Sequence, residues 1–271
     1  VDLANAGFTS NKIAQKIYNF IGTTLTSCIL KADTVAVTIN KYVDVLNAKY
    51  KTDNVALIPH GSFETPKNVS FDLPAGPKKV MAFGKFGTYK KVEILIDAVE
   101  LIRKTNNEEI EIVIAGTDSP NTPGYLQSVK EKYAHVEGIT FTGYVEENDV
   151  ERIFTESTIV AFPYTSTTGS SGVLHQAGSY GKAVVMPDLG DLALLVEDEG
   201  YKGEFFNPES ASSLAKAIST ILEDDNYRRR IAKTNYKAAC ALSMDKIVEM
   251  YLQKFKEIEI NKMVNTLVRN V

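Results

Sequence analysis

Short hydrophobic runs alternate with helix-like stripes along the middle of the chain. Five runs rich in β-branched residues predict strands buried on both faces, at 79–84, 109–116, 139–143, 157–163 and 183–188. Between the first two, "VEILIDAVELIRK" places Val92, Leu95, Val99 and Ile102 on one stripe with helical spacing. "NDVERIF", "SGVLHQAGSYG" and "SASSLAKAISTILED" are further helix candidates, the last with a serine cap. This alternation predicts a doubly wound, Rossmann-like parallel sheet, whose ligands bind at the carboxyl ends of its strands.

The chain before this sheet follows a different pattern. Residues 8–31 and "KYVDVLNAKY" predict helices, while 34–39 and 55–61 predict single strands. Two strands do not make a domain, and Val1 is not an initiator methionine. We therefore expect a fragment, with residues 1–60 as the remnant of a second α/β lobe.

The remaining boundaries follow from composition and periodicity. Residues 61–78 hold three prolines and two glycines and predict a linker. Residues 79–240 carry the predicted sheet. Residues 241–271 predict a long helix with no strand after it, which we expect to pack back on the first lobe.

Composition excludes several classes of function. The net charge of −4 gives no support to a nucleic-acid-binding surface. Cys28 and Cys240 are far apart in sequence, which favours reduced thiols in a cytoplasmic protein. The uncharged run Phe20 to Leu30 is too short to span a bilayer and lacks a cleavage site typical of a signal peptide.

Two of the predicted strand ends carry residues suited to a ligand. "GKFGTYKK" places Lys85 and Lys90 around a glycine turn, where two ammonium groups could hold a diphosphate or could simply be solvated. "TGYVEEN" offers Gly143 and Tyr144, whose backbone and ring could hold a flat base, although a tyrosine here could equally be packing.

The stretch "TSTTGSSGVLHQAGSYGK" places glycines at the start of a predicted helix. Free N–H groups and the positive end of the helix dipole bind anions at such a place. Gln176, one turn further on, could reach a ribose hydroxyl, or it could be a satisfied polar residue at a helix end.

Other familiar motifs fail. The glycines fit neither a P-loop, nor the dinucleotide fingerprint G-x-G-x-x-G, nor a G-x-S-x-G nucleophile elbow. His60, His135 and His175 are too widely separated to argue for a zinc site, and no Asp-x-Asp motif supports a metal-bound nucleotide.

Taken in order, these pieces resemble the C-terminal, donor-binding half of retaining glycosyltransferases of the GT-B fold. The resemblance is to the group 1 or family 4 set, which includes glycogen-synthase-like enzymes, and it covers roughly residues 30–225. It rests on "ADTVAVTINKYVDVL…NVALIPHG", "AFGKFGTYKKVEILIDA", "ITFTGYVEENDVERIF…STIVAFPYTST" and "SSGVLHQAGSYGKAVVMPDLGD".

The resemblance assigns roles to individual residues. Lys85 and Lys90 stand at the family's arginine and lysine positions and would contact the nucleotide diphosphate. The backbone amides of Gly172, Val173 and Leu174 would bind it too, and Gly143, Tyr144 and Val145 would form the base-contacting loop.

The sequence departs from the family pattern at two positions. The family's two glutamates fall on Thr168 and Gln176, which would contact the transferred sugar and the ribose. Because both side chains are neutral here, the identity of the transferred sugar stays open.

The expected function is therefore transfer of a sugar, with retention and without a metal or other cofactor. The donor would be UDP-, GDP- or ADP-linked, and the acceptor a saccharide or a lipid-linked molecule. A missing N-terminal lobe would supply the acceptor site and the catalytic residues. We expect a cytoplasmic enzyme with peripheral contact at the inner membrane face. Two alternatives stay open: a non-catalytic nucleotide-binding lobe or subunit, and a sugar-nucleotide epimerase or a phosphorylase of the same fold.

Overall fold

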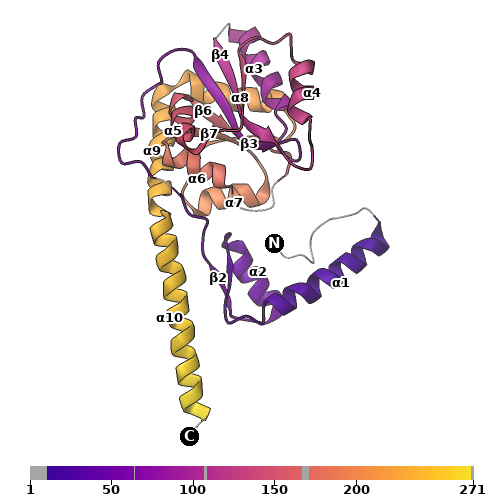
Figure 1. The fold of residues 1–271 in the computed structure, drawn as a ribbon, viewed down its shortest axis with the longest axis vertical. Coiled ribbons are helices and arrows are strands. Elements are labelled where there is room, and N and C mark those ends of the chain that lie inside the picture. Colours follow the sequence, from indigo (N-terminus) through magenta and orange to yellow (C-terminus); the bar gives the residue numbers. More distant parts are fainter. Residues whose placement is uncertain (1–10, 64, 107–108, 167–170, 270–271) are drawn as a thin grey trace. The chain divides into compact units, whose positions relative to one another are not determined.

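The structure, a computed structural model, describes residues 11–63, 65–106, 109–166 and 171–269 (Figure 1). They fall into two compact units. The smaller comprises the described chain up to Gly61 together with the chain from Met244 onward. The larger extends from Ser62 to Ser243, apart from the residues not described. Each unit is considered by itself.

The larger unit is built on one parallel sheet of six strands in the order β5-β4-β3-β6-β7-β8. The strands are β3 (Lys78–Phe86), β4 (Ile110–Asp118), β5 (Ile139–Gly143), β6 (Ile159–Ala161), β7 (Ala183–Pro187) and β8 (Glu204–Phe206). The chain moves outward from β3 to β5 and then returns to place β6 on the other side of β3. The point between β3 and β6 is thus where the strand order reverses, and such points bind ligands in open α/β sheets.

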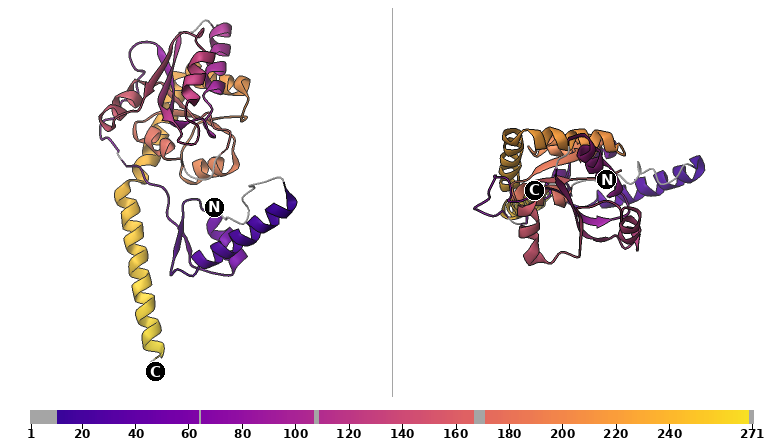
Figure 2. Two further views of the ribbon diagram at one scale, coloured as in Figure 1. Left: turned by 45° about the vertical axis from the view of Figure 1, so that its right-hand side comes forward. Right: turned by 90° about the horizontal axis from the view of Figure 1, so that it is seen from above.

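Helices cover both faces of this sheet (Figure 2). They are α3 (Glu93–Asn106), α4 (Tyr125–Lys132), α5 (Glu147–Glu156), α6 (Gly172–Ser179), α7 (Gly190–Asp198), α8 (Ala211–Glu223) and α9 (Asp225–Ala241). Alternate residues of β3 and β4, such as Val80 and Ile112, pack with α3 and α8 in the main core. On the other face, Phe154 of α5 lies against Phe83 and Tyr180. The predicted doubly wound sheet is confirmed.

The segment between the two units is held against α9. Arg228 donates a hydrogen bond to the carbonyl of Phe71, and Tyr236 donates one to the carbonyl of Pro66. Phe71 also lies close to Gly181, which has a φ of 60° and leaves no room there for a side chain. This proline-containing stretch is therefore packed along the larger unit, while the predicted domain boundaries stay predictions.

The smaller unit contains α1 (Lys12–Ile29), β1 (Val35–Val37), α2 (Lys41–Tyr50), β2 (Val55–Leu57) and α10 (Met244–Arg269). The two strands pair in parallel, Val35 with Val55. Ile39, Leu46 and Ile58 are buried residues of this unit. Lys262 of α10 forms an ion pair with Asp33, with 2.8 Å between Nζ and Oδ2.

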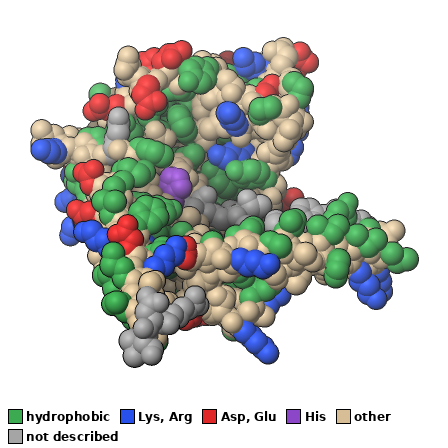
Figure 3. Space-filling model, turned by 60° about the horizontal axis from the view of Figure 1, so that its bottom comes forward, with side chains coloured by type: hydrophobic (Ala, Val, Ile, Leu, Met, Phe, Trp, Pro, Cys, Tyr) green, Lys and Arg blue, Asp and Glu red, His purple; other side chains and the backbone are tan. Residues whose placement is uncertain are grey.

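Helix α1 turns its hydrophobic stripe outward. Its buried positions are Gly22 and Thr26. Its exposed large hydrophobic residues are Ile13, Ile17, Tyr18, Phe20, Ile21, Leu25 and Ile29. Figure 3 shows hydrophobic side chains gathered along this helix, on the right of the view. A helix of a soluble protein normally buries such a stripe. Among the described residues, α1 instead exposes its hydrophobic positions and buries a glycine and a threonine.

Four elements were not predicted from the sequence: α4, α7, α9 and β8. Helix α9 buries Arg228, Ala232, Asn235 and Ala239 among others, so its inward face is not a hydrophobic stripe. Strand β8 has three residues, too few for a period of two to be recognised. Across the described chain, no helix combines the length and hydrophobicity that crossing a bilayer requires.

Candidate functional site

The carboxyl ends of β3 and β4 approach each other through two glycines. Gly84 and Gly116 are partners in the strand register, with φ of 128° and 138°. A Cβ on Gly116 would lie 1.9 Å from the carbonyl oxygen of Gly84, so only glycine fits there. The two half-buried glycines thus bring the strand backbones close together two residues before both strands end.

The loop after β3 is fastened to the loop after β6. Lys91 N–H donates to the carbonyl of Pro163, and Thr165 N–H donates to the carbonyl of Tyr89, both at 2.8 Å. Lys90 and Tyr164 form an isolated antiparallel bridge between these bonds. The backbone therefore fixes Lys90 at the point where the strand order reverses.

Lys90 holds its ammonium group in this junction. The residue is only 9% exposed, and its Nζ lies 4.8 Å from the centre of the Tyr164 ring. It also lies against Gly84, where an added Cβ would be 2.7 Å from Nζ. Burial lowers the pKa of Lys90 to about 8. No carboxylate of the described residues forms an ion pair with it, which leaves a partly buried cation available to an anion.

The first turn of α6 lies beside the same tyrosine. The Tyr164 hydroxyl is 3.5 Å from Oγ of Ser171, the residue before the helix. Ser171 makes no side-chain capping bond, and Leu174 N–H donates to its carbonyl at 2.9 Å. In the described structure, Gly172 and Val173 have no recorded partner for their N–H groups. Tyr164 thus connects the Lys90 cation with a helix N-terminus, a second feature that favours an anion.

The other predicted residues lie around this junction or away from it. Lys85 is exposed at the end of β3, and Gln176 is half-buried on α6. Gly143 has a φ of 70° and ends β5, followed by Tyr144, which is 73% exposed. Thr168 lies outside the described residues.

Tyr144 and Val145 line a polar groove of about 290 Å³ on the face of β4 and β5 that adjoins α5. The groove also contains Thr140, Thr142 and Glu111. The Thr142 hydroxyl accepts a hydrogen bond from Gly116 N–H at 3.2 Å, which links the end of β5 to the glycine pair. The predicted base-contacting loop therefore begins at the end of β5, the strand next to β4 and its Gly116.

The three histidines are separate in the fold. His60 contacts the carbonyl of Gly61, His135 stacks on Tyr133, and His175 is buried in α6. Within the described residues, no group of three or more histidine, cysteine, aspartate or glutamate side chains is arranged to hold a metal ion.

Sequence reasoning missed Tyr164 and Ser171. Tyr164 carries the ring that contacts Lys90 and the hydroxyl near the helix start, and it is 4% exposed. Its position directly after the strand next to β3 was the available signal, because side chains at the reversal point converge.

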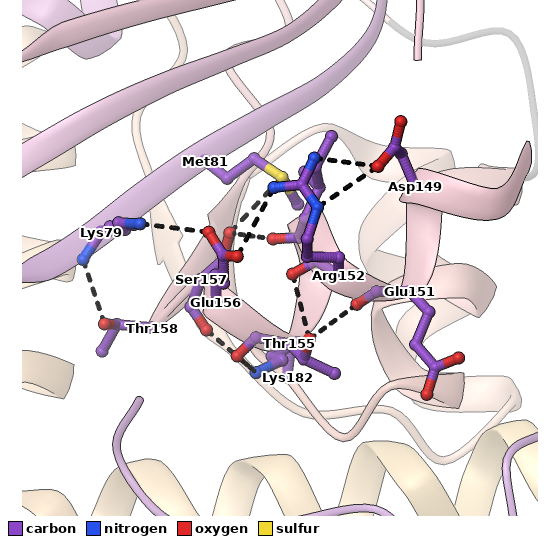
Figure 4. A network of polar contacts seen from close by, with 11 residues as sticks. Lys79, Met81, Asp149, Glu151, Arg152, Thr155, Glu156, Ser157, Thr158 and Lys182 are labelled. Atoms are coloured by element: carbon purple, nitrogen blue, oxygen red, sulfur yellow. Dashed lines mark hydrogen bonds and ion pairs between the residues drawn. The ribbon is translucent and has the colours of Figure 1, made fainter. Parts of the chain in front are cut away.

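The charged residues near the amino ends of the strands, which we call the amino edge of the sheet, have partners within the protein. Figure 4 shows Lys79 directed at Glu156 and Arg152 placed between Asp149 and Glu156. Lys182 is buried and donates to the carbonyls of Thr155 and Ser157, at the carboxyl end of α5. The cations of this edge therefore have structural partners, unlike Lys90.

Comparison with known proteins identifies the family of this fold. The profile described as "Glycosyl transferases group 1" matches residues 77–224, more than half of the chain. The chain belongs to this family. Its matched region contains every described residue of the Lys90 and α6 junction.

A curated relative is matched over part of its length. It is 29% identical over 165 residues to D-inositol 3-phosphate glycosyltransferase of Corynebacterium glutamicum, a match that spans 59% of this chain and 39% of that protein. The chain thus spans less than half the length of this curated relative.

Solved structures share the fold. Anabaena HepE in complex with UDP has a TM-score of 0.74 at 18% identity, covering 94% of this chain and 70% of HepE. The C-terminal domain of the group 1 glycosyl transferase LpcC from Francisella tularensis has a TM-score of 0.54 at 18% identity. That match covers 66% of this chain and 95% of the domain. The parallel-sheet architecture of glycosyltransferases of the GT-B fold is therefore present here.

Proposed function

We propose that this protein binds a nucleotide sugar and transfers the sugar to a saccharide or lipid-linked acceptor, with retention of configuration. Membership of the group 1 family supports a sugar transfer. The observation that carries the proposal is the Lys90 ammonium without a carboxylate partner, next to the first turn of α6. A fold that buries a cation beside free N–H groups suits a diphosphate.

Each part of the junction has a role in the proposed reaction. As the glycosidic bond breaks, negative charge grows on the leaving diphosphate. Lys90 and the N–H groups of Gly172 and Val173 stabilise this charge, and the exposed Lys85 adds a second cation. Groups already fixed in place lower the barrier without reorganising, so no metal ion is required for this step.

The ribose joins the base to the diphosphate, so both extend from the same end of it, and the transferred sugar extends from the other end. The backbone of Gly143 and Val145 and the Tyr144 ring hold the base, and the Gln176 amide donates to a ribose hydroxyl. HepE was solved with UDP and with UDP-glucose, which makes UDP the first nucleotide to test. Leu174 N–H already donates to Ser171, so Gly172 and Val173 supply the main backbone donors.

The acceptor binds to a further α/β lobe that covers α1. The outward hydrophobic stripe of α1 supports such a cover, because exposed stripes of this size are rare in isolated soluble domains. The match leaves 30% of HepE uncovered, which is consistent with the proposed lobe. An acceptor hydroxyl attacks the sugar on the face that the diphosphate leaves, and its proton passes to the departing diphosphate.

Calorimetric titration of UDP, GDP and ADP tests the donor site. We expect one nucleotide to bind selectively and Lys90→Ala to weaken its binding roughly tenfold to a hundredfold, the usual size for a hydrogen bond to a charged group. Lys104→Ala is the matched control, since Lys104 is an exposed lysine on α3. Failure of the wild-type protein to bind any of the three nucleotides would overturn the proposal.

Turnover of the corresponding nucleotide sugar tests the reaction. We expect release of nucleoside diphosphate to depend on an acceptor, to give a product with the donor's anomeric configuration, and to persist in EDTA. Binding without turnover for any acceptor would instead indicate a nucleotide-binding lobe. Interconversion of the donor without acceptor would indicate an epimerase.

A further inference from the structure

Three polar side chains are buried behind the first turn of α6. His175, the fourth residue of that helix, places Nδ1 3.0 Å from the Tyr201 hydroxyl and Nε2 3.5 Å from Oε2 of Glu199. The side chains of His175 and Glu199 are 1% and 6% exposed, and Tyr201 is 3% exposed. Glu199 and Tyr201 follow α7, so a different segment supplies two of the three groups.

The carboxyl group of Glu199 is unusual because neither of its oxygens makes a hydrogen bond in the described structure. Burial, and secondarily the charge of Asp198, raises its pKa to about 8. The groups facing it are His175 from α6, Tyr201 from the segment after α7, and Asp198 at the end of α7. Near neutral pH the His175–Glu199 pair therefore retains a proton on the carboxyl group or shares it with the imidazole.

Helix α6 has no room to move away from this pair. A Cβ on Gly178 would lie 2.7 Å from the Tyr201 ring and 2.9 Å from the carbonyl oxygen of Asn235. Asn235 is itself fixed, accepting from Lys202 N–H and donating to the Lys182 carbonyl. This tight packing at Gly178 favours an electrostatic effect of the pair's charge on the first turn of α6 over a displacement of the helix.

We propose that Glu199 is a positioning residue that acts through His175 to set the affinity of the first turn of α6 for the donor diphosphate. While the pair holds its proton, it is neutral and the N–H groups of Gly172 and Val173 attract the anion unopposed. Loss of that proton leaves one negative charge behind the helix start and weakens the attraction. This inference rests on the proposed donor site, and it adds a residue that does not touch the ligand.

The test compares nucleotide affinity between wild type and Glu199→Gln over a range of pH. The glutamine keeps the shape of the side chain and cannot ionise. We expect the ratio of the wild-type Kd to the variant Kd to be near one at pH 6.5. At pH 9.5 the ratio should rise to on the order of ten, the size expected for one poorly screened charge. Other groups that titrate near pH 8, Lys90 and Lys182, are present in both proteins and cancel in the ratio.

Asp198→Asn is the matched control, because it removes a neighbouring carboxylate that is exposed and screened by solvent. Its ratio should be near one both at pH 6.5 and at pH 9.5, where Glu199 has the same charge in both proteins. A ratio that differs from one but does not change with pH for Glu199→Gln would show a purely structural role and overturn the inference. Binding by neither protein at any pH would overturn the proposed function, and this inference with it.

A second variant keeps the test decisive if Glu199→Gln does not fold. His175→Gln removes the imidazole next to the carboxyl group, so the fall in affinity should move to higher pH. An unchanged midpoint in this variant would contradict the assigned coupling between His175 and Glu199.

Discussion

Charged residues have different partners at the amino edge of the six-stranded sheet, where its strands begin, and at the carboxyl edge, where they end. At the amino edge, Lys79 pairs with Glu156, Arg152 pairs with Asp149, and Lys182 caps α5 through two carbonyls. At the carboxyl edge, Lys90 is nearly as buried as Lys182, but it lies against the Tyr89 and Tyr164 rings and Gly84 and forms no ion pair with the described residues.

This contrast supports the proposed role of Lys90 in binding the donor. Burial lowers the pKa of both lysines to about 8, so the pKa shift by itself does not distinguish them. Their partners distinguish them. Lys182 donates to two carbonyls at the end of α5, whereas Lys90 lies where the strand order reverses. A cation that a fold desolvates without neutralising indicates a site for an anion from outside.

The largest expected effect comes from Gly116→Ala. The added Cβ would meet the Gly84 carbonyl at 1.9 Å, and a φ of 138° is unfavourable for alanine. We expect the free energy of unfolding to fall by roughly 3 kcal/mol or more, measured by urea denaturation. Gly124→Ala is the control, since its φ is 82° but no atom lies within 4 Å of the added Cβ. A similar loss in both variants would contradict the steric explanation.

Next in size is the dependence of nucleotide binding on pH. Lys90 binds an anion in its protonated form, so affinity should fall as pH rises above about 8, by up to about tenfold per pH unit. Bound anion raises the pKa of Lys90, and binding near pH 8.5 should therefore take up a proton. Titration in buffers of different ionisation enthalpy measures this uptake. The titration is made with the Glu199→Gln variant, so that Glu199 exchanges no proton. Adding Lys90→Met to that variant should abolish the proton uptake.

Replacement of Tyr164 should have a smaller effect. Tyr164→Leu removes the ring under the Lys90 ammonium, and we expect nucleotide binding to weaken severalfold, as for a partly buried cation–π contact. Tyr164→Phe keeps the ring and loses only a hydroxyl contact at 3.5 Å, which is long for a hydrogen bond. Its dissociation constant should change less than about threefold. Equal losses in the two variants would assign the role to the hydroxyl.

The smallest effect is expected at the amino edge. Partial burial opposes ionisation of Glu156, but hydrogen bonds and charge from Lys79 and Arg152 lower its pKa overall. Its stabilising contribution is present above the pKa of the unfolded chain and is lost as pH falls. Because the pair is partly exposed, Glu156→Gln should cost less than about 1 kcal/mol in thermal unfolding. Nucleotide affinity should not change. A change would contradict the interpretation that the charges of the amino edge have only a structural role.

Much of the larger unit was predictable from local pattern. All five strands predicted from hydrophobic runs are present, and Ser210 caps α8 by accepting from Ser213 N–H, as expected. Helix α9 was missed because polar and small residues make up much of its buried face. Its inward side is recognisable only once the segment around Phe71 is packed on it.

The candidate site was predictable in part. The sequence indicated Lys85 and Lys90 equally, as neighbours of one glycine turn. Only the fold distinguishes them: Lys85 is exposed, while the loop after β6 holds Lys90 against Tyr164. The role proposed for Thr168 stays a prediction.

The sequence by itself determined the alternation of strands and helices, the glycines at the strand ends and the charged residues that follow them. These depend on neighbours a few positions apart, since backbone geometry sets the periods of helix and strand. Only the tertiary structure decided which charges are neutralised. Lys79 meets Glu156 across 77 positions of sequence, and Lys90 meets no carboxylate among the described residues. Pairing between distant residues depends on how strands are ordered in the sheet, and local pattern does not encode that order.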